Sequence, residues 1–273
     1  QNDSQGNICY KGRTKKLNYD DVILPYSQKE ELFNDLKWFF DNPEWYRRRN
    51  IGHNRGYLFH GPPGTGKTSI SKMIASEFNK KLSIVNLSYI LNDQSLNELF
   101  GETDNSIVLI EDIDVISTNT HARSTSFSKR KSKSKTDEDE DKNEDEDEEE
   151  VYNYKSSSYG PTLSGLLNAI DGIVQSENRV LIMTTNDPDK LDSALLRPGR
   201  IDKKFYLGYM NNETMGLMFN KFFPDYEVQT FPDFDPEELQ MTPADLQEIF
   251  MENPFDPESA FNVVMESISP KQR

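Results

Sequence analysis

The stretch GYLFHGPPGTGKTSISKMIA, residues 56–75, restricts the possible folds more than any other part of the chain. Its apolar start, Tyr57–Phe59, predicts a short buried strand, and the apolar residues after Thr68 recur at the spacing of one helical face. Between them, residues 61–68 read GPPGTGKT and match G-x-x-x-x-G-K-[ST] at every fixed position. A glycine-rich loop between a strand and a helix is a phosphate-binding arrangement, so we expect a bound nucleoside triphosphate.

Phosphate chemistry explains the spacing inside this loop. Its glycines let the backbone curl until its N–H groups face phosphate oxygens. Lys67 supplies a positive charge to the β- and γ-phosphates, and the Thr68 hydroxyl is a ligand for Mg²⁺. A chance glycine-rich turn is the alternative, and it does not account for both flanks. The predicted nucleotide-binding residues are Gly61, Pro62, Pro63, Gly64, Thr65, Gly66, Lys67, Thr68 and Ser69.

Further strands and helices alternate along the chain. Apolar runs predict strands at 82–87, 107–110 and 179–186, and helical spacing predicts helices at 95–101 and from Leu163 onward. Strands that alternate with helices form parallel α/β sheets. We therefore predict the P-loop NTPase fold, a parallel sheet flanked by helices and followed by a small helical lid domain.

The chain divides into three predicted parts. Residues 1–19 are a polar N-terminal arm or linker, 20–207 are the α/β nucleotide-binding core, and 208–273 are the helical lid, where strand-like runs stop. The helices expected in the lid lie near 211–223, from Thr242 onward, and near 257–268.

A charged insertion interrupts the core over residues 117–160. Within it, residues 129–150 hold 6 Lys/Arg, 12 Asp/Glu and no apolar side chain, which predicts disorder. The whole chain carries a net charge of −16, and 25 basic and 35 acidic residues remain outside 129–150. Because duplex binding needs a cationic surface, we expect no nucleic acid as the main partner.

Acidic residues follow the buried strand in IVLIEDID, residues 107–114. Glu111 comes directly after the apolar run, so we expect it to help hold Mg²⁺ together with Thr68. Asp112 would then polarise the attacking water. Nucleotide-hydrolysing strands usually end in Asp-Glu, but either order supplies two carboxylates. A solvated strand end is the alternative, and it would leave the phosphate loop without its metal partner.

Two later stretches add polar candidates. Asn186 ends the strand of residues 179–186, where it could orient the water, although an Asx turn before DPDKLD is a credible alternative. LLRPGRID places Arg197 and Arg200 in a Pro-Gly loop. Arginine supplied in trans stabilises phosphoryl-transfer charge, so these two are catalytic candidates, with ordinary surface arginines as the alternative.

Other composition features limit the setting. The single cysteine, Cys9, allows no disulfide within the chain, which fits a reducing, intracellular compartment. The histidines at 53, 60 and 121 are scattered and form no metal motif. No apolar run approaches the roughly 18 residues of a membrane helix. We expect any membrane contact to come from segments that this sequence does not include.

Four motifs in this order, GPPGTGKT, IVLIED, TTN and LLRPGRID, resemble the AAA-type ATPases over roughly residues 20–270. NPEWYRRRNIGHNRGYLF, the Glu-Asp order and TLSGLLNAIDGI are similar to the Bcs1-like branch, whose members commonly carry Glu-Asp. The resemblance implies ATP and Mg²⁺ as ligands, a homo-oligomeric ring, and Arg197 and Arg200 acting across subunits. It also implies a protein client, in the founding member's case during respiratory-complex assembly at the mitochondrial inner membrane.

Two functions compete on these grounds. The first is an ATPase that couples hydrolysis to remodelling or moving a protein client. The pore-loop triplet of threading unfoldases is missing between Ser88 and Glu98, where Tyr89-Ile90 is a poor substitute, so a folded client is favoured. The second is an ATP-binding switch or scaffold that does not hydrolyse and that recruits partners through its charged insertion.

Overall fold

The computed structural model describes residues 17–116, 160–172, 178–226 and 230–268. Residues 117–159 of the insertion predicted to be disordered, and residues 1–16 of the predicted arm, lie outside the described residues.

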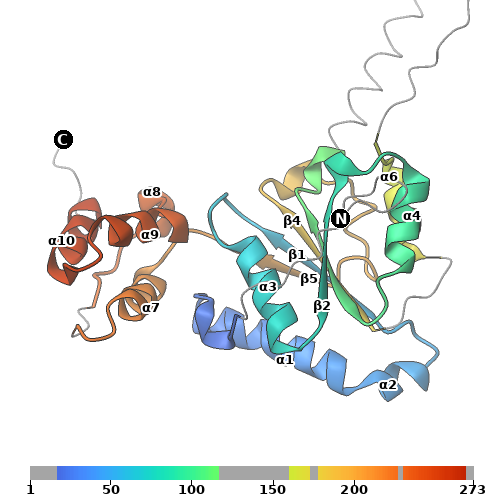
Figure 1. The fold of residues 1–273 in the computed structure, drawn as a ribbon, viewed down its shortest axis with the longest axis horizontal. Coiled ribbons are helices and arrows are strands. Elements are labelled where there is room, and N and C mark those ends of the chain that lie inside the picture. Colours follow the sequence, from blue (N-terminus) through green and yellow to red (C-terminus); the bar gives the residue numbers. More distant parts are fainter. Residues whose placement is uncertain (1–16, 117–159, 173–177, 227–229, 269–273) are drawn as a thin grey trace, which may run out of the picture.

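One five-stranded sheet lies at the centre of the molecule, in the order β2-β3-β4-β1-β5 (Figure 1). Every neighbouring pair of strands is parallel. The strands are β1 (Asn54–His60), β2 (Lys81–Asn86), β3 (Ser106–Glu111), β4 (Arg179–Thr185) and β5 (Lys203–Tyr206). In this order β4 lies between β1 and β3, so the strand with the acids is one place removed from the strand that leads into the phosphate loop.

Helices cover both faces of the sheet. One face carries α1 (Tyr26–Asp41) and α3 (Lys67–Glu77), and the other carries α4 (Asp93–Gly101) and α6 (Leu163–Asp171). Short helices precede or join them: η1 (Tyr19–Asp21), α2 (Pro43–Arg47), η2 (Leu87–Tyr89) and η3 (Pro188–Lys190). The α/β fold with a parallel sheet, predicted from the sequence, is confirmed.

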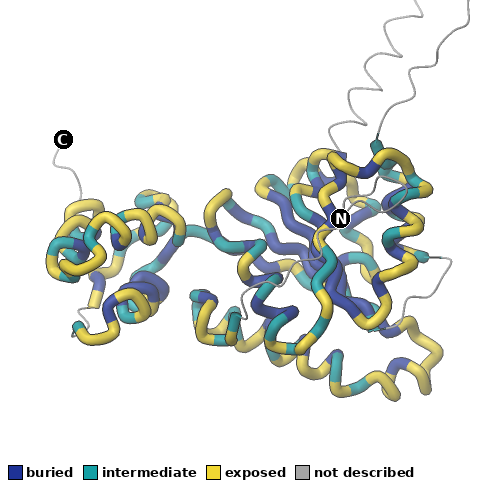
Figure 2. Tube along the Cα trace, viewed as in Figure 1, coloured by how far each residue is buried: buried dark blue, intermediate teal, exposed yellow. Residues whose placement is uncertain are grey.

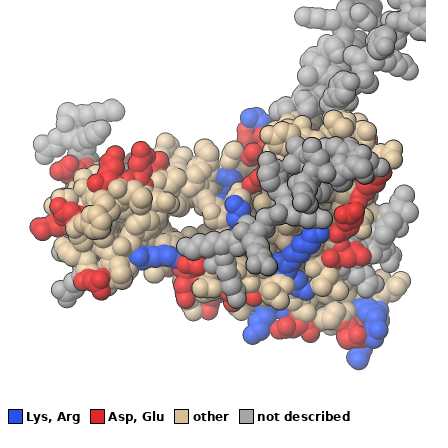
Figure 3. All heavy atoms as spheres, in the orientation of Figure 1, with Lys and Arg blue, Asp and Glu red and all other residues tan. Residues whose placement is uncertain are grey.

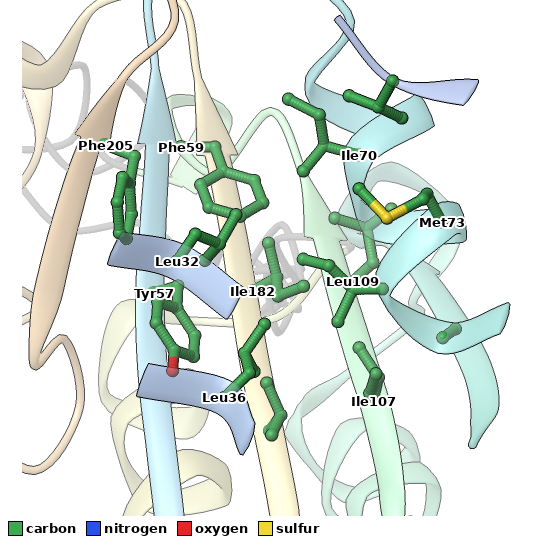
Figure 4. Packing of buried hydrophobic residues seen from close by; sticks show 14 of the residues in the cluster. Leu32, Leu36, Tyr57, Phe59, Ile70, Met73, Ile107, Leu109, Ile182 and Phe205 are labelled. Carbon is green, nitrogen blue, oxygen red and sulfur yellow. The ribbon is translucent and has the colours of Figure 1, made fainter. Parts of the chain in front are cut away.

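The central strands are buried on both faces because their apolar runs have no polar side. In β3, Ile107 and Leu109 pack toward α1 and α3, whereas Val108 and Ile110 pack toward α4 and α6. Figure 4 shows the first of these clusters, in which Leu32 and Leu36 of α1 lie against Tyr57. Figure 2 shows the same core as a continuous buried layer along the strands.

Four further helices follow the sheet: α7 (Asn212–Phe222), α8 (Pro236–Leu239), α9 (Pro243–Glu252) and α10 (Pro257–Ile268). They pack around a separate apolar cluster with Phe219 and Phe250 at its centre. Figure 1 shows them at the opposite end of the long axis from α2 and joined to the sheet by the segment after β5. Side-chain caps fix where they begin, as when Asn211 accepts from Thr214 N and Thr242 accepts from Asp245 N.

Several short elements were not predicted, among them β5, α2, α8 and the three-residue η helices. β5 reads KKFY, only four residues with two lysines, and no apolar run marks it. It forms because its backbone pairs with β1 in register, Tyr57 opposite Lys203 and His60 opposite Tyr206. α8 is a single turn opened by Pro236. Other boundaries moved little: β1 is longer than predicted, and β2 begins one residue earlier than predicted.

Candidate nucleotide-binding site

The phosphate loop joins β1 to α3 and has the backbone that its glycines permit. Gly61, Gly64 and Gly66 have φ values of 141°, 81° and 88°. At Gly61 an added Cβ would lie 2.1 Å from the backbone oxygen of Leu207, so a side chain has no room there. The N-terminus of α3, an 11-residue helix, begins directly after Gly66. Its unpaired N–H groups and positive dipole end suit an anion.

Lys67 is almost buried inside this loop. Its ammonium donates to the carbonyls of Gly61 at 2.8 Å and Pro62 at 2.7 Å. Burial lowers the pKa of Lys67, and the nearby negative charge of Asp112 opposes that shift. A buried cation with one acidic neighbour is suited to a polyphosphate, because the ligand's charge offsets the cost of desolvation.

Thr68 and Glu111 lie in direct contact at the mouth of the site. The Thr68 hydroxyl donates to Glu111 Oε1 at 2.6 Å, although the two residues come from α3 and β3. Together they present oxygen ligands of the type that Mg²⁺ prefers when phosphates and waters complete its coordination. The residues present therefore fit a magnesium–triphosphate pair. When bound, the metal would neutralise phosphate charge.

Asp112 has a backbone conformation that is unusual for a residue with a side chain, with φ of 50°. Two contacts with β4 hold it there: Asp112 N donates to Thr184 Oγ1 at 3.2 Å, and Ile113 N donates to the Thr184 carbonyl at 3.0 Å. Such strain is typical of functional positions. The chain turns sharply at Asp112, directly after Glu111 at the end of β3.

Asp114 has a different environment. Its Oδ1 accepts from the Thr185 hydroxyl at 2.9 Å, and this hydroxyl also accepts from Asp187 N at 3.0 Å. Asp114 thus fixes the end of β3 to the end of β4. Thr184 and Thr185 are both buried, and sequence reasoning gave them no role. Two hydroxyls at the end of an apolar strand were the available signal.

Asn186 follows β4 directly and is exposed at the strand end. Thr185 pairs with His60 at the end of β4 and β1, and Asn186 comes directly after Thr185. Asn186 therefore lies beside the start of the phosphate loop. The Asx cap that the sequence left as an alternative is made by Asp187, whose side chain accepts from Asp189 N. Among the described residues no hydrogen bond of the Asn186 side chain is found, which leaves it available to a ligand.

The two arginines of the Pro-Gly loop differ in their surroundings. Arg200 makes a two-pronged ion pair with Asp171 of α6, with Nε–Oδ1 at 2.7 Å and Nη2–Oδ2 at 2.5 Å. This pair raises the pKa of Arg200 and lowers that of Asp171. Arg197 is exposed, and in the described part of the chain its side chain makes no hydrogen bond or ion pair, although its charge helps to lower the pKa of Asp171. The structure therefore separates a held arginine from an available one.

The loop with these arginines is fixed to β1 through Gly56. Asp202 N donates to the Gly56 carbonyl at 2.8 Å, and Gly56 N donates to Asp202 Oδ2 at 2.9 Å. A Cβ on Gly56 would lie 1.8 Å from the Arg200 carbonyl oxygen. The arginine loop is therefore packed against β1, the strand that leads into the phosphate loop.

A pocket of about 340 Å³ opens beside Thr65 of the phosphate loop. The segment before α1, the end of β5 and the helices after it form its walls, with Leu24, Gln28, Tyr206 and Met210 among the lining residues. Its size and mixed apolar and polar lining suit a nucleoside. Sequence reasoning found no base-binding residues, because the walls come from segments far apart in the chain.

Several contacts close the helical part over this pocket. A Cβ on Gly64 would meet Thr242 Oγ1 at 3.1 Å, so the start of α9 lies against the phosphate loop. The Tyr206 hydroxyl donates to Glu237 at 3.0 Å, and Lys221 pairs with Asp21 at 2.9 Å. The space-filling view shows an opening between the two parts of the molecule (Figure 3).

With this geometry in view, comparison with known proteins decides the family. The model of the ATPase family associated with various cellular activities (AAA) matches residues 57–144 and 146–209.

The chain belongs to the AAA family of ATPases.

Within the AAA family, the relatives to which this chain is similar include members of the Bcs1-like branch. It is 38% identical over 241 residues to probable mitochondrial chaperone BCS1-B of Dictyostelium discoideum, covering 87% of this chain and 52% of that protein. It is 34% identical over 260 residues to mitochondrial chaperone BCS1 of Homo sapiens, covering 93% of this chain and 55% of that protein. It is also 35% identical to the Arabidopsis thaliana AAA-ATPase ASD, mitochondrial, over 84% of this chain and 46% of that protein. The chain spans about half the length of these relatives.

Two further findings concern a client or a membrane. Tyr89 is exposed whereas Ile90 is buried, so only Tyr89 of this pair is accessible to another molecule. In the described ranges, no helix is both long and apolar enough to cross a bilayer.

Proposed function

We propose that this protein hydrolyses ATP with Mg²⁺ and couples hydrolysis to the handling of a protein client in a homo-oligomeric ring. The contact that carries the proposal is the one between the Thr68 hydroxyl and Glu111, with Asp112 next in the chain. A metal-holding pair directly beside a second carboxylate is the arrangement that hydrolysis requires, and binding alone does not need it.

Each residue has a part in this proposal. The phosphate-loop backbone and Lys67 hold the β- and γ-phosphates, and Thr68 and Glu111 hold the metal. Asp112 accepts a proton from the attacking water, and Asn186 orients that water against the γ-phosphate. Arg197 reaches the nucleotide of a neighbouring subunit, while Arg200 positions the loop through Asp171. Transition-state charge would then be stabilised from two subunits.

The helical part, residues 208–273, is proposed to act as a lid, with 20–207 as the core. Support comes from the pocket between the two and from the contacts at Gly64, Tyr206 and Lys221. A nucleoside in this pocket would touch both parts, so its loss changes the contacts that orient the lid. Lid movement is the step that transmits hydrolysis to the client.

The names of the relatives support a mitochondrial location and a protein client. The relatives named above are called mitochondrial chaperones or a mitochondrial AAA-ATPase, so we place this protein in mitochondria and give it a protein client. Work at the inner membrane, including the assembly of a respiratory complex, is an extension of the same proposal.

Steady-state phosphate release tests the proposal. The wild type should turn over ATP, and Lys67→Ala should abolish turnover because it removes the phosphate-binding charge. Tight ATP binding without phosphate release over hours would replace the proposal with the non-hydrolysing switch. Capture of a protein by Asp112→Asn in the presence of ATP, released when ATP is withdrawn, tests the client.

A further inference from the structure

The helical part has a strongly one-sided charge. Residues 222–268 contain 12 Asp/Glu and no Lys or Arg. Figure 3 shows acidic side chains gathered on the outer end of this part. Four of these acids are exposed around the connection between α9 and α10, which with Phe255 we call the acidic end: Glu248, Glu252, Asp256 and Glu258.

Phe255 projects from this acidic end into solvent, with 96% of its surface exposed. The loop around it is ordered, since Asn253 Nδ2 donates to the Ile249 carbonyl at 3.0 Å and Asp256 accepts from Ser259 N at 3.0 Å. An exposed aromatic side chain on an ordered loop contributes no burial of apolar surface to the stability of its own chain. Such residues are typical anchors of protein interfaces.

A second exposed surface has the opposite character. It lies at the end of α1 and along α2, and we call it the basic aromatic patch. Its exposed residues are Lys37, Trp38, Trp45, Arg47, Arg48, Arg49 and Ile51.

The aromatic residues of this patch are arranged for contact. Trp38 and Trp45 touch edge to face with ring centroids 5.3 Å apart, and each exposes more than a third of its surface. The Arg49 guanidinium lies over the Trp45 ring at 4.2 Å. Tryptophan and arginine together are the residue types that dominate binding energy at protein interfaces.

The two surfaces cannot meet within one molecule. Figure 1 shows α2 and the α9–α10 end at opposite ends of the long axis. An acidic surface with an aromatic knob and a basic surface with two tryptophans complement each other in charge and chemistry. We propose that the acidic end of one copy docks on the basic aromatic patch of the next copy.

This contact is head to tail, so each copy uses one surface and offers the other. Heterologous contacts of this kind form rings when the rotation closes and filaments when it does not. The inference rests on the proposed ring and names the surfaces that build it. A second copy is favoured over an anionic membrane as the occupant, because this chain itself carries the complementary surface.

Two charge reversals test the contact with little risk to the fold. Arg48→Glu with Arg49→Glu changes two exposed side chains and leaves the Arg47–Glu44 ion pair intact. Glu248→Lys with Glu252→Lys changes two exposed residues in α9, and a lysine in the last turn suits the helix dipole. The control, Lys81→Glu, reverses an exposed charge on β2, outside both surfaces.

Sedimentation velocity with a non-hydrolysable ATP analogue gives the readout. The wild type should assemble, the control should match it, and each double variant should weaken self-association by at least about tenfold. A mixture of the two double variants in equal amounts should recover self-association, because the unchanged acidic end fits the unchanged basic patch and the reversed end fits the reversed patch. Phe255→Ser should also weaken assembly. A quadruple variant that carries all four charge reversals in one chain should regain assembly, because its reversed end fits its reversed patch.

Other results overturn the inference. Variants that assemble like the wild type would locate the ring contact elsewhere and leave the proposed ring standing. A wild type that stays monomeric would remove the ring and this contact together, whereas its ATP turnover would still be measured separately. Binding of the wild type to anionic phospholipid vesicles, lost in Arg48→Glu/Arg49→Glu while self-association persists, would assign the patch to a membrane.

Discussion

The Thr68 hydroxyl lies 2.6 Å from Glu111 Oε1, although 43 positions separate the two residues in the chain. This contact brings the first turn of α3 against the end of β3, across the intervening strand β4. It supports the roles that we propose for the two acids, because Glu111 contacts Thr68, the residue type that holds the metal in phosphate loops of this kind. We therefore propose Asp112 as the residue that acts on the attacking water.

Arginine supply in trans can be tested by mixing inactive subunits. Arg197→Ala leaves the phosphate loop intact, and Lys67→Ala leaves the arginine loop intact, so each should be inactive alone. Co-expressed mixtures should recover part of the ATP turnover, because some interfaces then combine a good phosphate loop with a good Arg197. The control mixture, Lys67→Ala with Asp112→Asn, should stay inactive, and equal recovery there would contradict the prediction.

Gly56 should tolerate no side chain. A Cβ would lie 1.8 Å from the backbone oxygen of Arg200, so we expect Gly56→Ala to lower the free energy of unfolding by roughly 2 kcal/mol or more. Gly216→Ala is the matched control, since nothing lies within 4 Å of its Cβ in the middle of α7. It should stabilise the helix by about 0.5–1 kcal/mol. Urea denaturation measures both, and similar effects of the two substitutions would count against this packing.

Asp35 gives a pH dependence with a defined sign. Burial favours its neutral form, but hydrogen bonds from Arg55 and Tyr57 outweigh burial and hold the pKa of Asp35 below its ordinary value of 3.8. A depressed carboxyl contributes stability above the unfolded pKa and loses it as pH falls through the folded pKa.

Asp35→Asn should therefore lower the free energy of unfolding by about 1–3 kcal/mol at pH 7. The difference from the wild type should shrink as pH falls below about 3.8 and then through the lower pKa of the folded wild-type carboxyl, which also becomes neutral there. Urea denaturation at a series of pH values measures it. A difference that grows toward low pH would show that the sign is wrong.

Much of the fold followed from local sequence. The strands β1, β3 and β4 are apolar runs with polar ends, and α10 was predicted with its observed bounds, 257–268. These segments are readable because burial on both faces demands continuous apolar residues. β5 was not predicted, because it is a strand through its backbone pairing with β1. No pattern of side chains in the sequence indicates this pairing.

Candidate site residues could be proposed from the sequence where they lie in one local motif. They could not be proposed where the contact joins segments that are far apart in the chain. The phosphate loop and Glu111 follow from adjacent residues. The ion pair of Arg200 with Asp171 joins positions 29 apart, and the pocket beside Thr65 needs walls from both ends of the chain. Long-range contacts of this kind depend on strand order, which the sequence pattern left open.

The most direct test of the account compares Glu111→Gln with Asp112→Asn in two assays, magnesium-dependent ATP binding and phosphate release. Glu111→Gln should weaken the magnesium dependence of binding. Asp112→Asn should bind ATP and magnesium like the wild type yet release phosphate at least about 100-fold more slowly, since it lacks only the proton acceptor. Wild-type phosphate release by Asp112→Asn, or unchanged magnesium dependence in Glu111→Gln, would contradict the roles assigned to these two acids.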